Sequence, residues 1–422
     1  MSRYKRWILP LIAALLLCTL FTACDSEPAS SGDSESESGT PAVTTTAVEE
    51  VTEPDTETET EPEAQPVTEP VVPPETEPET EPETEAETEP ETTAVTEAET
   101  EAPKGQNVGA YINPLTGLKT DKDYSNRRPA AIMINNERSS LPQVGISQAD
   151  VIYECLTEGG ITRLLMLVSD YDSLPTIGSV RSARDYYLDF AQNHDAIYVH
   201  AGGSTYAYEQ IQSRRINNLD GVNMYLPNNA FFRDAERLKT MLYEHCLMTN
   251  GKGIVNSIAF KKYRTEVKES YNNPFVFAEK EVIPTAGDAK HVIITYNSGQ
   301  FPQFIYNAAS NTYKRWQLRG EAHIDGATGE QLAFTNLLIL VCDHGSYNDD
   351  YGRITVDTTG SGTGYYVYGG MYMPIKWSKA TRDSQISFTD TKGNQLEINP
   401  GKTFVSIISP YVEDTLQLNY TR

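Results

Sequence analysis

Two arginines three positions apart are the residues of this sequence best suited to binding an anion. Arg181 and Arg184 lie at the first turn of a stretch that we predict to be helical over 182–193, with Ser182 as its N-cap and Asp185 at the capping-box position. A helix start already attracts anions through its free N–H groups and dipole, and it normally favours acidic side chains. Two guanidinium groups there indicate an anion between them, unless both form structural ion pairs with carboxylates of a neighbouring strand.

A glycine-rich turn supplies a second candidate site. His200 ends a predicted strand, and Gly202, Gly203 and Ser204 lead into a predicted helix from about residue 205. Glycines at such a turn let the backbone approach a ligand closely, Ser204 suits an N-cap, and His200 could serve as acid, base or hydrogen-bond donor. An ordinary strand-to-helix loop has the same pattern, and no G-x-S-x-G motif supports Ser204 as a nucleophile.

Two glutamates and an arginine form the third candidate. We predict a two-residue hairpin turn at Gly159-Gly160, which pairs Glu158 with Ile161. This register would place Arg163 on the same face of the sheet as Glu154 and Glu158. The three side chains would then form either the polar wall of a site or a surface ion cluster.

Metal and cofactor sites are poorly supported, and we predict neither. His194 and His200 lie six positions apart, without the spacing of a histidine metal motif. Cys155, Cys246 and Cys342 are an odd number of widely spaced thiols, which excludes a disulfide framework. One long-range disulfide among them stays open.

The elements that must position these residues change character along the chain, and we predict an α+β fold. The first half mixes strands and helices, and the second half consists mainly of alternating or β-branched segments separated by turns, typical of an antiparallel sandwich or barrel. In the first half we predict strands over 128–134, 151–157, 161–169 and 196–201, and helices over 182–193, from 205 and over 231–248. In the second half we predict strands over 291–297, 312–320, 336–343, 353–357, 365–377 and 402–409.

The first residues have the order of a secretory signal peptide, over 1–23. Three basic residues precede an uncharged apolar run that is too short to span a membrane comfortably. Cys24 follows Thr-Ala, which is typical of a bacterial lipobox, so we predict lipidation of its thiol. Simple secretion or an uncleaved anchor are the alternatives. The lipid would hold the chain on the outer face of the plasma membrane, exposed to the cell wall.

An acidic low-complexity segment over 24–104 accounts for the net charge of −25. Residues 25–103 contain 26 of the 59 acidic residues and no Lys or Arg, so we predict a disordered tether. Outside the signal peptide and tether the chain has 33 acidic and 31 basic residues, so it lacks the excess of basic residues typical of nucleic-acid-binding proteins. The remaining length predicts two domains, over 105–255 and 256–422.

An ordered set of six segments is similar to the YerB-like lipoproteins of Gram-positive bacteria. The segments are Asn113–Gly117, Arg128–Asn136, Ala149–Glu154, Glu158–Arg163, Ser179–Arg184 and His200–Ser204. The resemblance implies a lipoprotein with an N-terminal and a C-terminal domain and supplies no reaction. The family pattern has Pro-His-Asn after its Phe-x-Arg-Asp element, whereas this chain has Lys239-Thr240-Met241, so a catalytic histidine there would be missing.

Two functions from different classes fit these patterns. The first is a binding module for an anionic wall polymer or an envelope protein, using Arg163, Arg181, Arg184, His200 and the Gly202–Ser204 turn. The second is a hydrolase or transferase acting on envelope glycans, with Glu158 or Asp185 as acid or base and His200 assisting. The sequence contains no complete catalytic motif, which favours binding.

Overall fold

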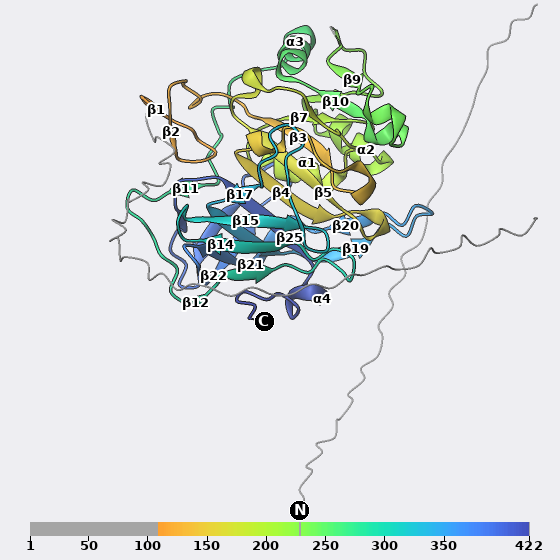
Figure 1. Ribbon diagram of the computed structural model, residues 1–422. Coiled ribbons are helices and arrows are strands. Elements are labelled where there is room, and N and C mark those ends of the chain that lie inside the picture. The colour runs from red at the N-terminus through yellow and green to blue at the C-terminus, as the bar shows by residue number, and fades with distance from the viewer. Residues whose placement is uncertain (1–108, 228, 422) are drawn as a thin grey trace, which may run out of the picture. The chain divides into compact units, whose positions relative to one another are not determined.

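A computed structural model of the protein describes residues 109–227 and 229–421, which belong to one compact unit (Figure 1). The predicted signal peptide, Cys24 and the tether over 24–104 lie outside the described residues. Strands predominate over helices, which confirms the predicted α+β class. Within the described ranges, no helix is both long and apolar enough to cross a membrane.

One mixed sheet of eleven strands forms the centre of the described structure. Its strands, in spatial order, are β12 (Gly287–Asp288), β22 (Met371–Lys379), β21 (Gly360–Tyr368), β18 (Asn336–Val341), β25 (Thr403–Ile408), β4 (Val151–Leu156), β5 (Thr162–Val168), β3 (Ala130–Asn135), β7 (Ile197–His200) and β8 (Asn218–Asp220), with β23 (Ser387–Asp390) paired to β22. The strand triplets β18-β25-β4 and β3-β7-β8 are parallel, and the other pairs are antiparallel. The domain boundary predicted at residue 255 stays a prediction. The main sheet contains strands that precede this residue and strands that follow it.

The central strands are continuous apolar runs because both faces of the sheet are covered. β3, β18 and β25 are buried along their whole lengths. One face packs against α1 (Asp185–Gln192) and α2 (Thr205–Ser213) through a tyrosine-rich core. The other face packs against α3 (Gly251–Lys261) and a second sheet.

The second sheet has five short strands and lies over the C-terminal part of the main sheet (Figure 1). Aromatic side chains join the two sheets: the rings of Phe304 and Phe334 each lie 5.0 Å from the ring of Phe404 on β25. The predicted C-terminal strands are therefore divided between these two sheets, except the one over 353–357, which pairs with His344–Ser346 in a small separate sheet. The five strands are β13 (His291–Ile293), β14 (Gln303–Asn307), β15 (Thr312–Gln317), β16 (Glu321–Ala322) and β17 (Ala333–Phe334).

The remaining elements are short. Three pairs of strands form separate two-stranded sheets: β1 (Tyr111–Ile112) with β2 (Lys119–Thr120), β11 (Val276–Phe277) with β24 (Glu397–Ile398), and β19 (His344–Ser346) with β20 (Ile354–Val356). A three-stranded sheet contains β6 (Ile177–Gly178), β10 (Leu247–Thr249) and β9 (Phe231–Arg233). The helical elements are α4 (Pro410–Glu413) and the 3-10 helices η1 (Arg138–Ser140), η2 (Ile146–Gln148), η3 (Glu158–Gly160), η4 (Tyr171–Ser173), η5 (Arg237–Lys239) and η6 (Tyr243–His245).

The helix predicted over 231–248 is wrong. Its two ends pair with each other as β9 and β10, and only the 3-10 turns η5 and η6 lie between them. The Asp234 side chain accepts hydrogen bonds from the backbone of Glu236 and Arg237, which favours a local turn over a continuous helix. The helix that does form is α3, capped by the Asn250 side chain, and its two glycines concealed it in the sequence.

Candidate functional site

All candidate residues except Glu154 and Asp185 lie at the edge where β3 and β7 end and β5 begins. Ligands of open sheets often bind outside the carboxyl ends of parallel strands. The extended segment before α1 runs along this edge, since the backbone N–H of Arg181 donates to Met133 on β3. The carbonyl of the same residue accepts from Ala201, just after β7. The segment over 181–184, called the arginine segment below, therefore lies beside the glycine-rich turn.

Two of the three candidate arginines converge on Glu158. Arg184 donates from Nε to Glu158 at 2.7 Å and makes a second, closer contact, while Arg163 donates to the same carboxylate at 3.1 Å. Burial would raise the pKa of Glu158, but the hydrogen bond from Arg184 and the charge of Arg163 outweigh it and lower the pKa to about 2. Glu158 is therefore a fixed anion at neutral pH.

Glu154 lies on the opposite face of the sheet from Arg163, so the predicted arrangement of the three side chains is wrong. Thr157 pairs with Ile161 across a three-residue loop, which sets Arg163 opposite Cys155. This is a shift of one residue from the predicted two-residue turn, and such a shift moves every side chain of a strand to the other face.

Glu154 instead forms a buried ion pair that joins the main sheet to the second sheet. Arg315 on β15 donates to its carboxylate at 2.7 Å, and neither side chain is accessible to solvent. Thr162 and Asn136 donate to the other carboxylate oxygen at 2.7 and 3.1 Å. Because both oxygens are occupied and the side chain is closed to solvent, Glu154 has a structural role.

The N-cap of α1 differs from the predicted one. The helix begins at Asp185, and its N-cap is Arg184, whose side chain makes no capping hydrogen bond. Arg181 therefore precedes the helix instead of lying in its first turn. Ser182 contributes its backbone carbonyl, which accepts a hydrogen bond from Arg163 at 3.0 Å.

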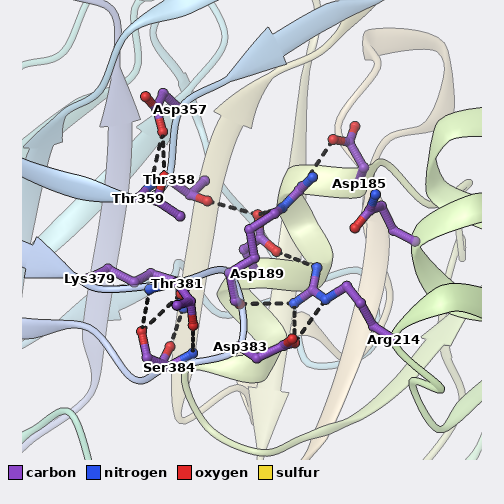
Figure 2. Close-up of polar contacts among 12 residues, drawn as sticks. Asp185, Asp189, Arg214, Asp357, Thr358, Thr359, Lys379, Thr381, Asp383 and Ser384 are labelled. Carbon is purple, nitrogen blue, oxygen red and sulfur yellow. Dashed lines mark hydrogen bonds and ion pairs between the residues drawn. The ribbon is translucent and has the colours of Figure 1, made fainter. Parts of the chain in front are cut away.

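Asp185 belongs to a separate ion cluster that fastens the loop after β22 to the two helices (Figure 2). Arg382 donates to Asp185 at 3.0 Å and to Asp189 at 2.8 Å. Arg214, the C-cap residue of α2, completes the cluster by donating to Asp189 at 2.6 Å. Arg382 and Tyr347 both donate to Oδ2 of Asp185, the latter at 2.8 Å, which fixes this carboxylate in the cluster and leaves it poorly placed to act as an acid or base.

A buried lysine lies beside this cluster. Lys379 is 2% exposed and donates to the Asn193 side chain at 2.7 Å and, at closer range, to the Ser384 carbonyl. Burial lowers the pKa of Lys379 to about 8. Its contacts hold the 379–384 loop in place and explain why so long a side chain is buried.

The glycine-rich turn is stabilised from within. The two ring nitrogens of His200 lie 2.8 Å from the Gly202 carbonyl and 3.0 Å from the Asn218 side chain. Gly202 has a φ of 71°, and Ser204 caps α2 as predicted by accepting from Ala207 at 3.1 Å. Gly203 forms a bridge with Ala183, which aligns the turn with the arginine segment. His200 thus orients the turn, and both of its ring nitrogens are occupied by these contacts.

Arg181 has the weakest contacts of the three arginines. Its guanidinium lies 3.8 Å from Glu137 and 3.7 Å from Glu244, which are ion pairs without hydrogen bonds. Its Nε is buried and has no hydrogen-bond partner among the described residues, and the same holds for Nε of Arg163. Arg181 is 18% exposed at its side chain, so a ligand could reach the edge of its guanidinium.

Sequence reasoning missed the residues that surround Arg181. Glu137 follows β3, and Glu244 and His245 lie in η6, inside the segment that we predicted as a helix. His245 is buried, with Nδ1 2.9 Å from the Asn135 side chain and Nε2 3.2 Å from Ser139. The pairing of β10 with β6 brings this segment to the site, and no pattern in the local sequence predicts that pairing.

Among the described residues, no group of three or more His, Cys, Asp or Glu side chains could hold a metal ion. Cys155, Cys246 and Cys342 are buried free thiols, so the disulfide left open by the sequence is not formed. Burial raises the pKa of Cys342 to about 12 and that of Cys155 as well, which makes both thiols poor nucleophiles.

Comparison with known proteins places this architecture in a class of two-part proteins without an assigned reaction. Residues 115–264 match the N-terminal domain of a protein of unknown function (DUF3048), and residues 292–405 match its C-terminal domain. A candidate lipoprotein of Bacillus subtilis, YerB, is 30% identical over 299 residues, covering 70% of this chain and 85% of the relative. The crystal structure of B. subtilis YerB matches with a TM-score of 0.63 and 28% identity, covering 73% of this chain and 99% of that one. The chain therefore belongs to the YerB-like family.

Proposed function

We propose that this protein is a lipoprotein anchored through Cys24 on the outer face of the plasma membrane, and that its folded part binds an anionic group of the cell wall or of an envelope protein. The lipobox sequence and the lipoprotein name of the B. subtilis relative support the anchor. Cys24→Ala should abolish incorporation of labelled fatty acid into the chain. Retained label would contradict the anchor.

The contacts of Arg181 carry the proposed binding site. Arg163 and Arg184 share the single carboxylate of Glu158, so two positive charges face one negative charge and a net positive charge remains beside Arg181. Arg181 itself makes only long contacts, to Glu137 and to Glu244, and the latter side chain is 52% exposed. A phosphate or carboxylate could displace Glu244 and accept charge-assisted hydrogen bonds from the guanidinium.

The glycan hydrolase or transferase is less well supported by the site. A glycosidase needs two carboxyl groups that face each other across a cleft. Glu154 and Glu158 lie on opposite faces of the main sheet, and Asp185 is held by Arg382 and Tyr347. The pKa of Glu158, about 2, is also too low for a general acid at neutral pH.

The test is binding of the full chain, in detergent micelles, to poly(glycerol phosphate) as a phosphate-rich polymer and to polyglutamate as a carboxylate polymer. We expect binding to at least one polymer, weakening with salt, and a loss of about tenfold in Arg181→Ala at low salt. Arg319→Ala, which removes an exposed arginine outside the site, is the matched control. Equal affinities of the Arg181 variant and the unmodified chain would show that Arg181 is not part of the binding site.

A further inference from the structure

A pocket lies beside α3 and shares no residue with the arginine site. Its volume of about 510 Å³ falls within the range of small-molecule sites. Val255, Ile258 and Ala259 of α3 form one apolar wall, and Tyr263 extends it. A pocket with this lining can bury an aliphatic stem of several methylene groups, each contributing through the area that it removes from water.

The pocket is held open by backbone contacts between the segments that form it. The segment over 126–128 is bonded to the segment over 265–267, and the start of α3 is bonded to the turn after η4. These hydrogen bonds run from Arg128 to Thr265 at 2.8 Å, from Val267 to Asn126 at 3.0 Å and from Gly251 to Leu174 at 3.0 Å. The cavity is therefore preformed, which lowers the ordering cost of binding.

The one arginine in the wall of the pocket is already neutralised. The Arg127 guanidinium stacks on the Tyr171 ring at 3.9 Å and binds the Asp172 carboxylate through two nitrogens, one of them at 2.9 Å. A ligand carboxylate would have to compete with this bidentate pair. The arginine thus stiffens the wall and gives the pocket no net positive charge.

Two carboxylates that line the pocket have no basic partner within the described ranges. Glu266 makes no side-chain hydrogen bond or ion pair within the described ranges, and Asp123 accepts only from its neighbour Ser125, at 2.9 and 2.7 Å. After Arg127 and Asp172 cancel, the lining carries two uncompensated negative charges above an apolar wall. This combination favours a cation and disfavours an anion.

We propose that this pocket binds a primary ammonium group on an aliphatic stem, such as a lysine side chain of a peptide or an alkylamine. The stem lies along Val255, Ile258 and Ala259, and the ammonium group lies between Asp123 and Glu266. The pocket would give the protein a second ligand class, opposite in charge to the anion proposed for Arg181.

Three probes with the same six-carbon stem separate the contribution of charge from that of burial: hexylammonium, hexanol and heptanoate. Saturation-transfer NMR titrations of the full chain at low salt should give hexylammonium an affinity about tenfold above that of hexanol, and heptanoate should bind more weakly than hexanol. The double variant Asp123→Asn, Glu266→Gln should bind hexylammonium and hexanol equally. Glu279→Gln, Glu397→Gln makes the same charge change elsewhere and should keep the preference.

A pocket-filling variant tests the location. Ala259 lies on the exposed side of α3, so Ala259→Trp should fill the cavity without unfolding the helix and should abolish binding of both hexylammonium and hexanol. Arg181→Ala should leave both affinities unchanged, so failure here is distinguishable from failure of the anion site. Equal affinities for the three probes, no binding of any probe, or undiminished binding in Ala259→Trp would each overturn the proposal.

Discussion

Glu154 on β4 and Arg315 on β15 form an ion pair of 2.7 Å that is closed to solvent on both sides. The Arg315 guanidinium also contacts His323 and lies 4.9 Å from the centre of the Phe404 ring. The pair connects the region that matches the N-terminal family model to the region that matches the C-terminal one. Its energetic role is therefore to hold the two sheets in one arrangement.

Removing one member of this pair should be strongly destabilising, because the other charge would stay buried without a partner. We expect Arg315→Met to lower the free energy of unfolding by about 3 to 5 kcal/mol in urea titrations. The double variant Glu154→Gln, Arg315→Met should lose less unfolding free energy than the sum of the losses in the two single variants. Lys239→Met, which breaks the exposed pair with Glu236, is the control and should cost less than about 1 kcal/mol.

Arg184 and Arg181 should differ in their contributions to stability. Arg184→Ala removes the closest hydrogen bonds to Glu158 and should cost about 1.5 to 3 kcal/mol. Arg181→Ala removes only contacts of 3.7 and 3.8 Å and should cost less than about 1 kcal/mol. Urea unfolding of the two variants measures the difference. Equal losses would mean that Arg181 is as much a part of the architecture as Arg184.

The stability contributed by Glu158 should disappear in acid. Its pKa falls from the ordinary 4.5 to about 2 in the folded protein, so the unfolded chain binds the proton first as pH decreases. The contribution is complete above about pH 4.5 and is lost as pH falls towards 2. The difference in unfolding free energy between the unmodified chain and Glu158→Gln should therefore shrink through this window. A constant difference between pH 6 and pH 3 would show that the ion pairs do not lower this pKa.

Gly251 should tolerate no side chain despite its place in a helix. A Cβ atom there would lie 2.3 Å from the Tyr171 carbonyl oxygen, which is backbone and cannot turn aside. Gly251→Ala should thus lower the unfolding free energy by about 1 to 3 kcal/mol, although alanine normally stabilises helices. Lys252→Ala, on the exposed side of the same turn, should change it by less than about 0.5 kcal/mol.

Local patterns predicted the central strands and the cap of α2, because apolar runs and N-cap residues act over a few positions. They failed where distant residues decide the outcome. The helix predicted over 231–248 lost to the pairing of β9 with β10, and a single extra loop residue at Glu158 turned Glu154 away from Arg163.

The candidate site was predictable only in part for the same reason. Glu158 and Arg163 flank one turn, so the sequence brings them together by itself. Glu137 and Glu244 approach Arg181 through the small sheet of β6, β10 and β9, whose pairing leaves no signature in either segment.

The position of β25 sets the order in which the protein can be completed during synthesis. This strand is the last in the chain, yet it lies between β18 and β4 and bonds to both. Until residues 403–408 have been synthesised, β4 and β18 each lack their neighbouring strand on one side. A nascent or truncated chain would expose two unpaired strands at the middle of its sheet, where chaperones or proteases can reach them.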